Sequence, residues 1–560
     1  MRQRRRIPRE ARWRRLLVLG VLLLPSSVFA SDAKSDRDHW AFRPLRRVTP
    51  PSIEDPWVRN PVDRFVLAKL REKKLTPAAE ADRSTLLRRA HLDLLGFPPA
   101  PKLAKSFVND AKGFPYEKLI DRLLESDHFG ERWGRHWLDV ARFGESEGSN
   151  PEEDRERGHS YKYRDAVIRA FNADLPFDEF VAFQVSGKSL DPEEDAALGK
   201  DLSAFPKLGT RLQRNSHPND KTFHILDDMV SAFGSSFLGL TIGCARCHDH
   251  KLDPISSAEY YELTAVFFDM ANVSDKVGVN QVDLFREPFL LAGGSWQRPV
   301  RKVEPGFVRV LMRDGLEAKS WSVNEKNELR PREALAHWVT DAEKGGGALL
   351  ARVIVNRLWQ HHFGQGIVRT PNDFGQLGEL PTHPDLLDWL AGELIRGNWR
   401  LKPMHRLLMS SATYRQSAGE RWASVDADNK WLWHFRTRRL EAEAIRDSIL
   451  SASGALITKL YGPSISIGSS RRRYREKPSH WRRSIYLMTP RFVSHPVLGV
   501  FDSVNNFQSQ GTRRVSTTPN GALFMLNSGF LRKQAEILSE RVRKEAPAGV
   551  GSKVDWLYGL

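Results

Sequence analysis

The sequence contains almost no cysteine: Cys244 and Cys247 are the only two among its 560 residues. A disulfide between them would close a loop of so few residues that it would remove little entropy from the unfolded chain. A redox-active C-x-x-C pair would need a thioredoxin-like βαβ context, and the flanking sequence offers none. A structural disulfide and a pair of inert thiols both stay open as interpretations.

The N-terminus also lacks an apolar run of the length that a transmembrane helix needs. The apolar run at residues 16–24 is too short to span a bilayer comfortably. An Arg-rich stretch precedes it, and Val28-Phe29-Ala30 follows before Ser31. This pattern predicts a signal peptide over residues 1–30. We therefore expect export to the periplasm or cell envelope, with membrane association only if this segment stays uncleaved.

The chain lacks the dense basic patch expected of a nucleic-acid-binding protein. Its formal net charge is +17, and removing residues 1–30, with eight Arg and one Glu, lowers it to +10. The sharpest remaining cluster is interpreted as a solvated basic loop and consists of Arg471, Arg472, Arg473, Arg475, Lys477, Arg482 and Arg483. We expect no nucleic-acid partner.

What the sequence does contain is Cys244-Ala245-Arg246-Cys247-His248. C-x-x-C-H is the attachment sequence of c-type haem, in which both thiols bond to the haem vinyl groups and the histidine ligates the iron. The motif predicts one covalent haem c held by Cys244, Cys247 and His248, with His248 as the metal ligand. Export agrees with this prediction, because c-type haem is attached outside the cytoplasm. A zinc site is the alternative, and it would need a fourth ligand from elsewhere.

The surroundings of this motif offer further candidates. The sixth iron ligand is sought among His217, His224, Met229 and Met270, and a methionine would favour a higher potential than a second histidine. His250 lies too close to His248 in sequence to reach the opposite haem face. The candidates for orienting the haem propionates or the His248 ring are Asp249, Lys251 and Asp253, the last being equally a turn residue before Pro254.

Hydrophobic periodicity predicts a mainly α protein with a small β-rich insertion. Helices are expected over residues 60–70, 84–95, 116–143 with a break near Gly130, 163–172, 178–184, 227–237, 258–268, 351–363, 384–395, 403–416, 438–453 and 521–543. Short strands are expected at 289–291, 307–310 and 483–488. The predicted organisation is a signal peptide (1–30), a helical domain with the C-x-x-C-H motif (31–270), a β-rich insertion or linker (271–335) and a helical C-terminal domain (336–560).

The second helical domain combines polar and aromatic residues. The polar group comprises Asn356, Arg357, His361, His362, Asp373, His383, Asp385 and Asp388. Trp359, Trp389 and Trp399 are candidates to line a carbohydrate-stacking cleft. Against this, His361 and His362 end a helix, where cations suit the helix dipole, and Trp389 follows an apolar core stripe. A last group is interpreted as ion pairs on a helix surface and consists of Arg439, Glu441, Glu443 and Arg446.

Several stretches resemble a planctomycete-type cytochrome c family of large exported proteins with two paired domains of unknown function. Residues 239–255, which include the C-x-x-C-H motif, resemble the first domain, as do 136–142 and 176–178. The stretches that resemble the second domain are 351–364, 381–390, 411–415 and 439–447. The chain departs from many relatives in having no separate N-terminal cytochrome domain, in Asn520-Gly521 where relatives usually show Gln-Ala, and in stopping at Leu560, where relatives tend to continue.

The resemblance implies a kind of protein without specifying a reaction. Our leading hypothesis is an exported c-type haem protein whose electron transfer to a periplasmic redox partner is coupled to oxidation of an organic substrate. Carbohydrate is the substrate class that the aromatic and basic composition favours. The alternatives are a non-catalytic haem-bearing electron carrier or envelope scaffold, and a zinc-dependent hydrolase that uses the Cys/His cluster.

Overall fold

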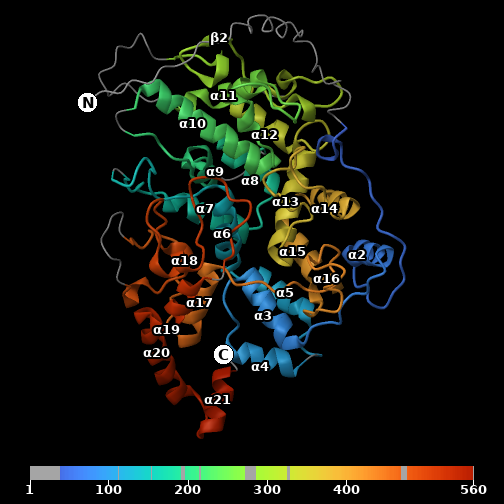
Figure 1. Cartoon of the computed structure of the whole chain (residues 1–560), viewed down its shortest axis with the longest axis vertical. Coiled ribbons are helices and arrows are strands. Elements are labelled where there is room, and N and C mark those ends of the chain that lie inside the picture. The colour runs from blue at the N-terminus through green and yellow to red at the C-terminus, as the bar shows by residue number, and fades with distance from the viewer. Residues whose placement is uncertain are drawn as a thin grey trace, which may run out of the picture.

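The computed structural model describes residues 38–558 except 111, 153, 191–195, 214–215, 272–284, 324–327, 468–475 and 517. The predicted signal peptide and residues Arg471 to Arg475 of the basic cluster lie outside the described residues. In the described part the protein is mainly α, as predicted, with a single two-stranded antiparallel sheet (Figure 1). Across these same ranges, no helix is both long and apolar enough to cross a membrane.

The elements fall into two helical series separated by the sheet. The first series comprises α2 (Pro61–Glu72), α3 (Arg83–Leu94), α4 (Pro101–Asn109), α5 (Tyr116–Leu124), α6 (Phe129–Val140), α7 (Tyr161–Asn172), α8 (Phe177–Ser186), α9 (Ala196–Leu202), α10 (Pro218–Phe233) and α11 (Ser257–Ala271). The strands are β1 (Phe289–Leu291) and β2 (Pro299–Lys302). The second series comprises α12 (Pro331–Thr340), α13 (Gly347–Phe363), α14 (Pro384–Arg396), α15 (Leu401–Met409), α16 (Ala412–Arg415), α17 (Ala442–Ser453), α18 (Pro496–Val500), α19 (Pro519–Asn527), α20 (Gly529–Glu545) and α21 (Val550–Tyr558).

Local signals in the sequence explain several helix boundaries. Helix α2 begins with a capping box, in which the Asn60 side chain accepts from the backbone N–H of Val62 at 3.0 Å and Asp63 accepts from that of Asn60 at 3.2 Å. The predicted break near Gly130 is confirmed, because α5 ends at Leu124 and α6 begins at Phe129. Gly130 itself lies inside α6, where a Cβ would sit 2.3 Å from the carbonyl oxygen of Ile168 in α7. Only glycine allows these two helices to pack so closely.

Some predicted elements are wrong. The strand at 289–291 is confirmed as β1, but residues 307–310 and 483–488 form no strand and contribute 3-10 helices at Arg309–Leu311 and Ser484–Tyr486. Phe307, Val310, Ile485 and Tyr486 pack into the helical core, and Leu487 forms an isolated bridge with Ile465. The apolar residues therefore record burial and not a strand ladder. The single helix expected at 403–416 is two, because Ser411 caps α16 by accepting from the N–H of Tyr414 at 3.1 Å.

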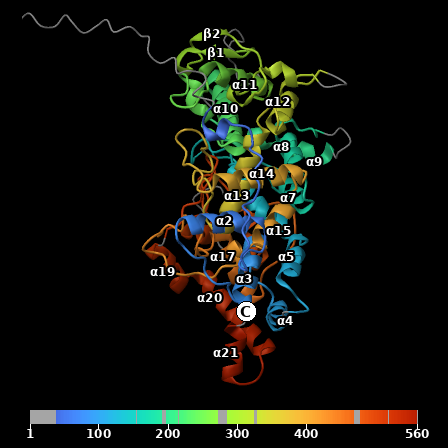
Figure 2. The same cartoon turned by 90° about the vertical axis from the view of Figure 1, so that its right-hand side faces the viewer.

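One hydrophobic core spans both helical series, from Ala41 to Tyr486. The N-terminal segment packs on the second series: α2 lies beside α14 and α16 (Figures 1 and 2). Arg352 donates to the backbone carbonyl of Arg43 at 2.8 Å, and the buried Asp63 accepts from the N–H groups of Ala412 and Thr413 at 2.9 Å each. In both views α10, α11 and the sheet occupy one end of the molecule, and α20 and α21 occupy the other.

Candidate functional site

The C-x-x-C-H segment begins on a short 3-10 helix (Ile242–Arg246) between α10 and α11, and Cys247 and His248 follow directly after this helix. The chain reaches it through Gly239, which has a φ of +58° and lies so close to Phe374 that a Cβ would be 2.9 Å from that ring. Ile242 and Ala245 are buried and anchor the turn, and the Tyr261 hydroxyl donates to the carbonyl oxygen of Arg246 at 3.0 Å. The turn is therefore held on its inner side.

The two thiols lie on the outer side of this turn. Cys244 and Cys247 are both exposed, and neither forms a disulfide. Cys247 lies against Gly294, where a Cβ would approach its sulfur to 2.9 Å. Two free, solvent-accessible thiols at this spacing are the chemical groups that covalent haem attachment needs.

His248 is exposed and its ring is oriented by the backbone. The ring Nδ1 lies 2.7 Å from the carbonyl oxygen of Asp249. A carbonyl oxygen can only accept, so Nδ1 carries the proton and Nε2 keeps its lone pair. A ligating histidine usually has its second nitrogen fixed in this way by a carbonyl or carboxylate. The donor set of Cys244, Cys247 and His248 thus fits a c-type haem.

The rest of the motif stabilises the loop. His250 Nδ1 accepts from the N–H groups of Asp253 at 2.8 Å and Leu252 at 3.3 Å, and its Nε2 lies 3.3 Å from the Thr241 hydroxyl. Both nitrogens of His250 are therefore used within the loop. The carboxylate of Asp249 accepts from the N–H of Ser257 at 2.8 Å, at the start of α11.

Asp253 joins the motif to the second helical series. Its carboxylate is buried and accepts from the N–H of Gln376 at 2.8 Å. At the neighbouring Gly375 a Cβ would lie 2.3 Å from the same carboxylate. Asp253 therefore holds the motif against a loop more than a hundred residues away, whereas Lys251 is exposed.

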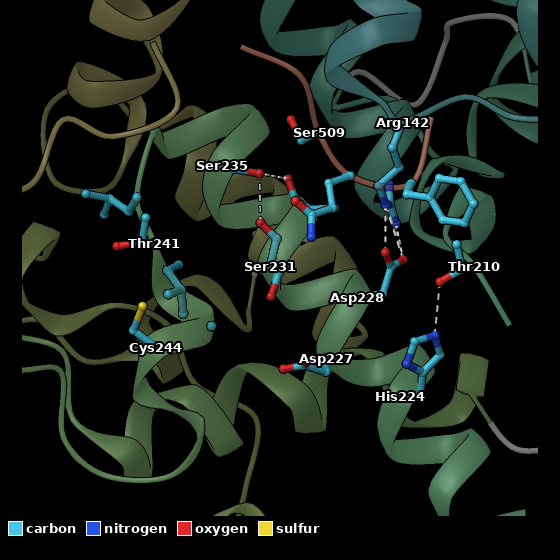
Figure 3. Close-up of a pocket in the computed structure, with 16 residues that line it drawn as sticks. Arg142, Thr210, His224, Asp227, Asp228, Ser231, Ser235, Thr241, Cys244 and Ser509 are labelled. Carbon is cyan, nitrogen blue, oxygen red and sulfur yellow. Dashed lines mark hydrogen bonds and ion pairs between the residues drawn. The ribbon is translucent and has the colours of Figure 1, made fainter. Parts of the chain in front are cut away.

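A cavity of about 440 Å³ opens beside Cys244. Figure 3 shows Cys244 and Thr241 on one side of it, with Arg142, Asp228 and His224 across from them. Arg142 binds Asp228 through two nitrogens, at 3.0 and 2.6 Å, and His224 Nε2 lies 3.1 Å from the Thr210 hydroxyl. The far wall of the cavity is therefore polar and charged.

The four candidate sixth ligands have different surroundings. His224 lines the cavity together with Cys244. His217 caps α10 by accepting from the N–H of Asn219 and stacks on Trp296 with ring centroids 4.7 Å apart. Met229 is buried and Met270 packs against the core. Of these four residues, His224 is the one that shares a cavity with a motif cysteine.

The prediction of an aromatic cleft in the second domain is wrong. Trp359, Trp389 and Trp399 are only 1%, 6% and 6% exposed and belong to the hydrophobic core. Their polar neighbours are structural as well. Asn356 pairs with the backbone of Val368 in both directions, at 2.9 and 2.8 Å, and Arg357 donates to backbone carbonyls of the π-helical turn Gly234–Leu238.

The interpretation of His361 and His362 as cations at a helix end is wrong. The interpretation of Glu441 and Arg446 as ion pairs on one helix surface is wrong too, because Glu441 pairs with Arg132 and Arg446 pairs with Glu476. Arg446 is fully buried. Burial lowers the pKa of His361 to about 3 and that of His362 well below 6.5, so neither ring carries the positive charge that a dipole interaction would require. Instead, His361 and Glu441 meet His136 of α6 in a cluster that sequence reasoning missed.

This three-residue cluster joins donors from distant parts of the chain. The candidate ligand atoms of His136, His361 and Glu441 all lie within 4.8 Å of one another. The two imidazole rings stack with centroids 3.6 Å apart and an interplanar angle of 26°. The Nδ1 of His136 is 4.0 Å from Glu441 Oε1, while Glu441 Oε2 accepts from Arg132 at 2.6 Å.

The protonation states of the cluster follow from burial and neighbouring charge. Burial lowers the pKa of His136 well below its usual value, as it does that of His361. Burial would raise the pKa of Glu441, but the guanidinium groups of Arg132 and Arg513 outweigh it and hold that pKa well below 4.5. The cluster therefore contains two neutral imidazoles and one carboxylate near neutral pH.

One signal in the sequence could have identified the cluster. His136 begins the stretch 136–142, His361 lies in 351–364 and Glu441 lies in 439–447. All three stretches carry the resemblance to the family with paired domains, although hundreds of residues separate the first from the last.

Comparison with known proteins gives two family matches. Residues 61–272 match the family described as PSCyt2, protein of unknown function (DUF1549), and residues 331–560 match PSD1, protein of unknown function (DUF1553). These are the paired planctomycete-type domains that the resemblance implied. No curated protein and no solved structure matches the chain.

Proposed function

We propose that this chain, which pairs the DUF1549 and DUF1553 domains, is an exported c-type haem protein that transfers electrons outside the cytoplasm. The observation that carries the proposal is the state of the exposed His248 ring, whose Nδ1–H is held by the Asp249 carbonyl so that Nε2 is left as the ligand nitrogen, next to two free thiols. One haem c bound by Cys244, Cys247 and His248 would supply one-electron chemistry.

The loop supports attachment because it is held in place on its inner side. Tyr261, His250 and Asp253 fix the backbone through the hydrogen bonds described above, while both cysteines are exposed. A rigid loop presents both thiols and the imidazole in a constant arrangement, so little ordering entropy is lost on attachment.

The cavity beside Cys244 is where we place an organic substrate. Its polar wall includes His224, Asp227 and Thr210, which can hydrogen-bond the hydroxyl groups of a substrate, whereas Arg142 is buried and paired with Asp228. Leu240 and Ile242 add apolar contacts on the other side. The proposal that the substrate is a carbohydrate is supported by the polar side chains of this wall. Trp359, Trp389 and Trp399 do not support it, because they are buried. A redox partner outside the cytoplasm would then accept the electrons.

The first test is the mass of the exported mature protein made together with haem-maturation machinery. We expect the mass to increase by one haem and the reduced protein to show a sharp α-band. The Cys244→Ala/Cys247→Ala variant should lose the covalent haem. The His248→Ala variant should keep the mass increase of one haem, but its visible spectrum should change. Leu252→Ala, an exposed change in the same loop at a residue with no assigned role, is the matched control. An apo mass with no Soret band in the parent protein would rule out the proposal.

A second test separates an oxidoreductase from a plain electron carrier. The oxidised protein is mixed with a panel of sugars, and reduction of the haem is followed optically. Substrate-dependent reduction that is slowed in His224→Asn would support an oxidation at the cavity. Reduction by small chemical reductants alone, with no response to any sugar, would favour the non-catalytic carrier.

A further inference from the structure

We propose that His136, His361 and Glu441 form a binding site for one divalent first-row transition metal ion at the contact between the two domains. The site is separate from the C-x-x-C-H motif and does not depend on haem. His136 comes from α6 in the DUF1549 match, whereas His361 and Glu441 come from the DUF1553 match. Neither domain alone contains all three donors.

The donor geometry supports metal binding. Metal–nitrogen and metal–oxygen bonds of about 2.0–2.2 Å place neighbouring ligand atoms roughly 3–4 Å apart. The observed donors lie within 4.8 Å of one another, so small side-chain rotations would bring them to ligand spacing. The lone pairs of the two stacked rings lie in nearly parallel planes, so binding one ion requires one of the rings to turn about its Cβ–Cγ bond.

The second observation is that His136 has no hydrogen-bond partner. Its side chain is only about one-twentieth exposed, and neither Nδ1 nor Nε2 makes a hydrogen bond. A buried polar group without a partner costs free energy, commonly about 1–3 kcal/mol. A metal ion bound at one nitrogen would satisfy the atom that the protein leaves without a partner.

His91 shows what distinguishes this site from a merely buried histidine. Its two ring nitrogens are also buried without a partner, and burial lowers its pKa to about 4. Among the described residues, however, the only grouping of three such donor side chains is that of His136, His361 and Glu441. The difference is the convergence of donors, which burial alone does not produce.

The surroundings of the site hold its ligands in position. Trp133 packs against both rings, with centroids 5.2 Å from His136 and 5.7 Å from His361. Arg132 holds one oxygen of Glu441 and leaves Oε1 on the side of His136. Arg513 is paired with Asp139 at 2.6 Å and Glu443 at 2.5 Å, which limits the positive charge that it presents to an ion.

The chemistry of the donors selects the class of ion. Two imidazoles and one carboxylate form the ligand set of zinc hydrolases and of non-haem iron(II) sites, whereas Ca²⁺ and Mg²⁺ prefer oxygen ligands alone. An ion can enter from the side of His361, which is partly exposed, and of Glu441, whose side chain is 24% exposed. Three protein ligands leave at least one coordination position open.

The experiment uses the full mature chain, freed of metal with a chelator and then equilibrated with Zn²⁺ as the probe. We expect one zinc per chain by inductively coupled plasma mass spectrometry. Zinc X-ray absorption should show nitrogen and oxygen neighbours and no sulfur. Elemental analysis of the protein as purified then decides between zinc and iron. Iron is counted in the Cys244→Ala/Cys247→Ala variant, which carries no covalent haem.

Variants locate the site. His136→Ala and Glu441→Gln should each weaken zinc binding by at least about 100-fold, more than the loss of an outer partner usually costs. His361→Asn, at a partly exposed position, gives the same test if His136→Ala does not fold. The matched control is His91→Ala, which removes an equally buried histidine and should keep wild-type affinity. The Cys244→Ala/Cys247→Ala variant should also keep its zinc. The metal-site proposal therefore does not depend on the haem proposal and can hold if the haem proposal fails.

Three results would overturn the inference. The first is a chain that binds neither zinc nor iron stoichiometrically. The second is unchanged affinity in folded His136→Ala, His361→Asn and Glu441→Gln. The third is a sulfur neighbour in the absorption spectrum together with loss of zinc in the cysteine variant, which would place the ion at the C-x-x-C-H motif.

Discussion

The two candidate sites of this protein are built in opposite ways. The C-x-x-C-H loop draws its three functional residues from five consecutive positions and exposes them on one turn. The cluster of His136, His361 and Glu441 draws its residues from three distant segments and brings a buried histidine together with two partly exposed residues where the two domains meet. The residues of the first site are neighbours in the sequence, whereas those of the second come together only when the two domains pack.

This difference determines how each site can fail. A change in the loop removes a functional group and leaves the core intact, because the thiols and the His248 ring make few contacts. A change in the cluster affects a buried network that also includes Arg132, Arg513 and Trp133. Loss of function at the cluster must therefore always be compared with loss of stability.

The largest expected effect is that a variant of one site loses its bound group completely and keeps the group bound at the other site. Cys244→Ala/Cys247→Ala should abolish covalent haem and keep zinc at the cluster, whereas Glu441→Gln should keep haem and lose zinc. Both quantities are measured on the same preparations by intact mass and elemental analysis. If either variant lost both groups while remaining folded, the two sites would be one coupled unit and the comparison would be wrong.

The next effect concerns the contact between the loop and the second domain. Asp253→Ala removes a buried carboxylate that accepts from the Gln376 N–H, and a hydrogen bond to a charged group contributes about 1.5–3 kcal/mol. We expect the free energy of unfolding in urea to fall by about 2 kcal/mol. Lys251→Ala, an exposed neighbour, should change it by less than about 0.5 kcal/mol. Equal stability of the two variants would show that Asp253 contributes no net stability through this contact.

Buried histidines should make the protein sensitive to acid. Burial lowers the pKa of His383 to about 3, so between pH 6.5 and 3 the unfolded chain binds a proton at this position and the folded chain does not. Stability is therefore full above pH 6.5 and falls as the pH decreases toward 3, by about 1.4 kcal/mol per pH unit for this residue. Urea unfolding of His383→Gln between pH 4 and 5.5 should show a slope smaller by that amount. A slope equal to that of Lys251→Ala would contradict the burial of a neutral ring.

The smallest effect is expected at the exposed end of the loop. The Asp249 carboxylate accepts from the N–H of Ser257 at the N-terminus of α11, a capping interaction that contributes about 0.5–1 kcal/mol. Asp249→Ala should lower the free energy of unfolding by that amount and leave haem attachment unchanged, because the backbone carbonyl, not the side chain, holds His248. A loss of haem in this variant would assign the carboxylate a direct role.

Much of the fold could be predicted from local sequence. The mainly α class, the capping box of α2, the break before α6 and strand β1 all follow from signals within a few residues. Residues 307–310 were misassigned because alternating apolar residues look the same whether they face a sheet or a helical core. Burial of Trp359 is a tertiary property that the sequence of α13 alone does not specify.

The sites show the same division. Cys244, Cys247 and His248 were identified from spacing, because their chemistry is local. Glu441 was assigned to helix-surface ion pairs because i, i+4 spacing is consistent with exposed charges on any helix. Its true neighbours, His136 and Arg132, are about 300 positions away, and only the packing of α6 against the second domain brings them together.

The packing of the N-terminal segment also constrains the order of events as the chain is made. Asp63 accepts backbone N–H groups that lie 349 and 350 positions later, at Ala412 and Thr413. During synthesis the Asp63 side chain therefore lacks these two partners until about three quarters of the chain has emerged. Contacts of such long sequence separation form slowly. We therefore expect the contact between α2 and α16 to form late in folding, and a chain that ends before residue 413 cannot complete it.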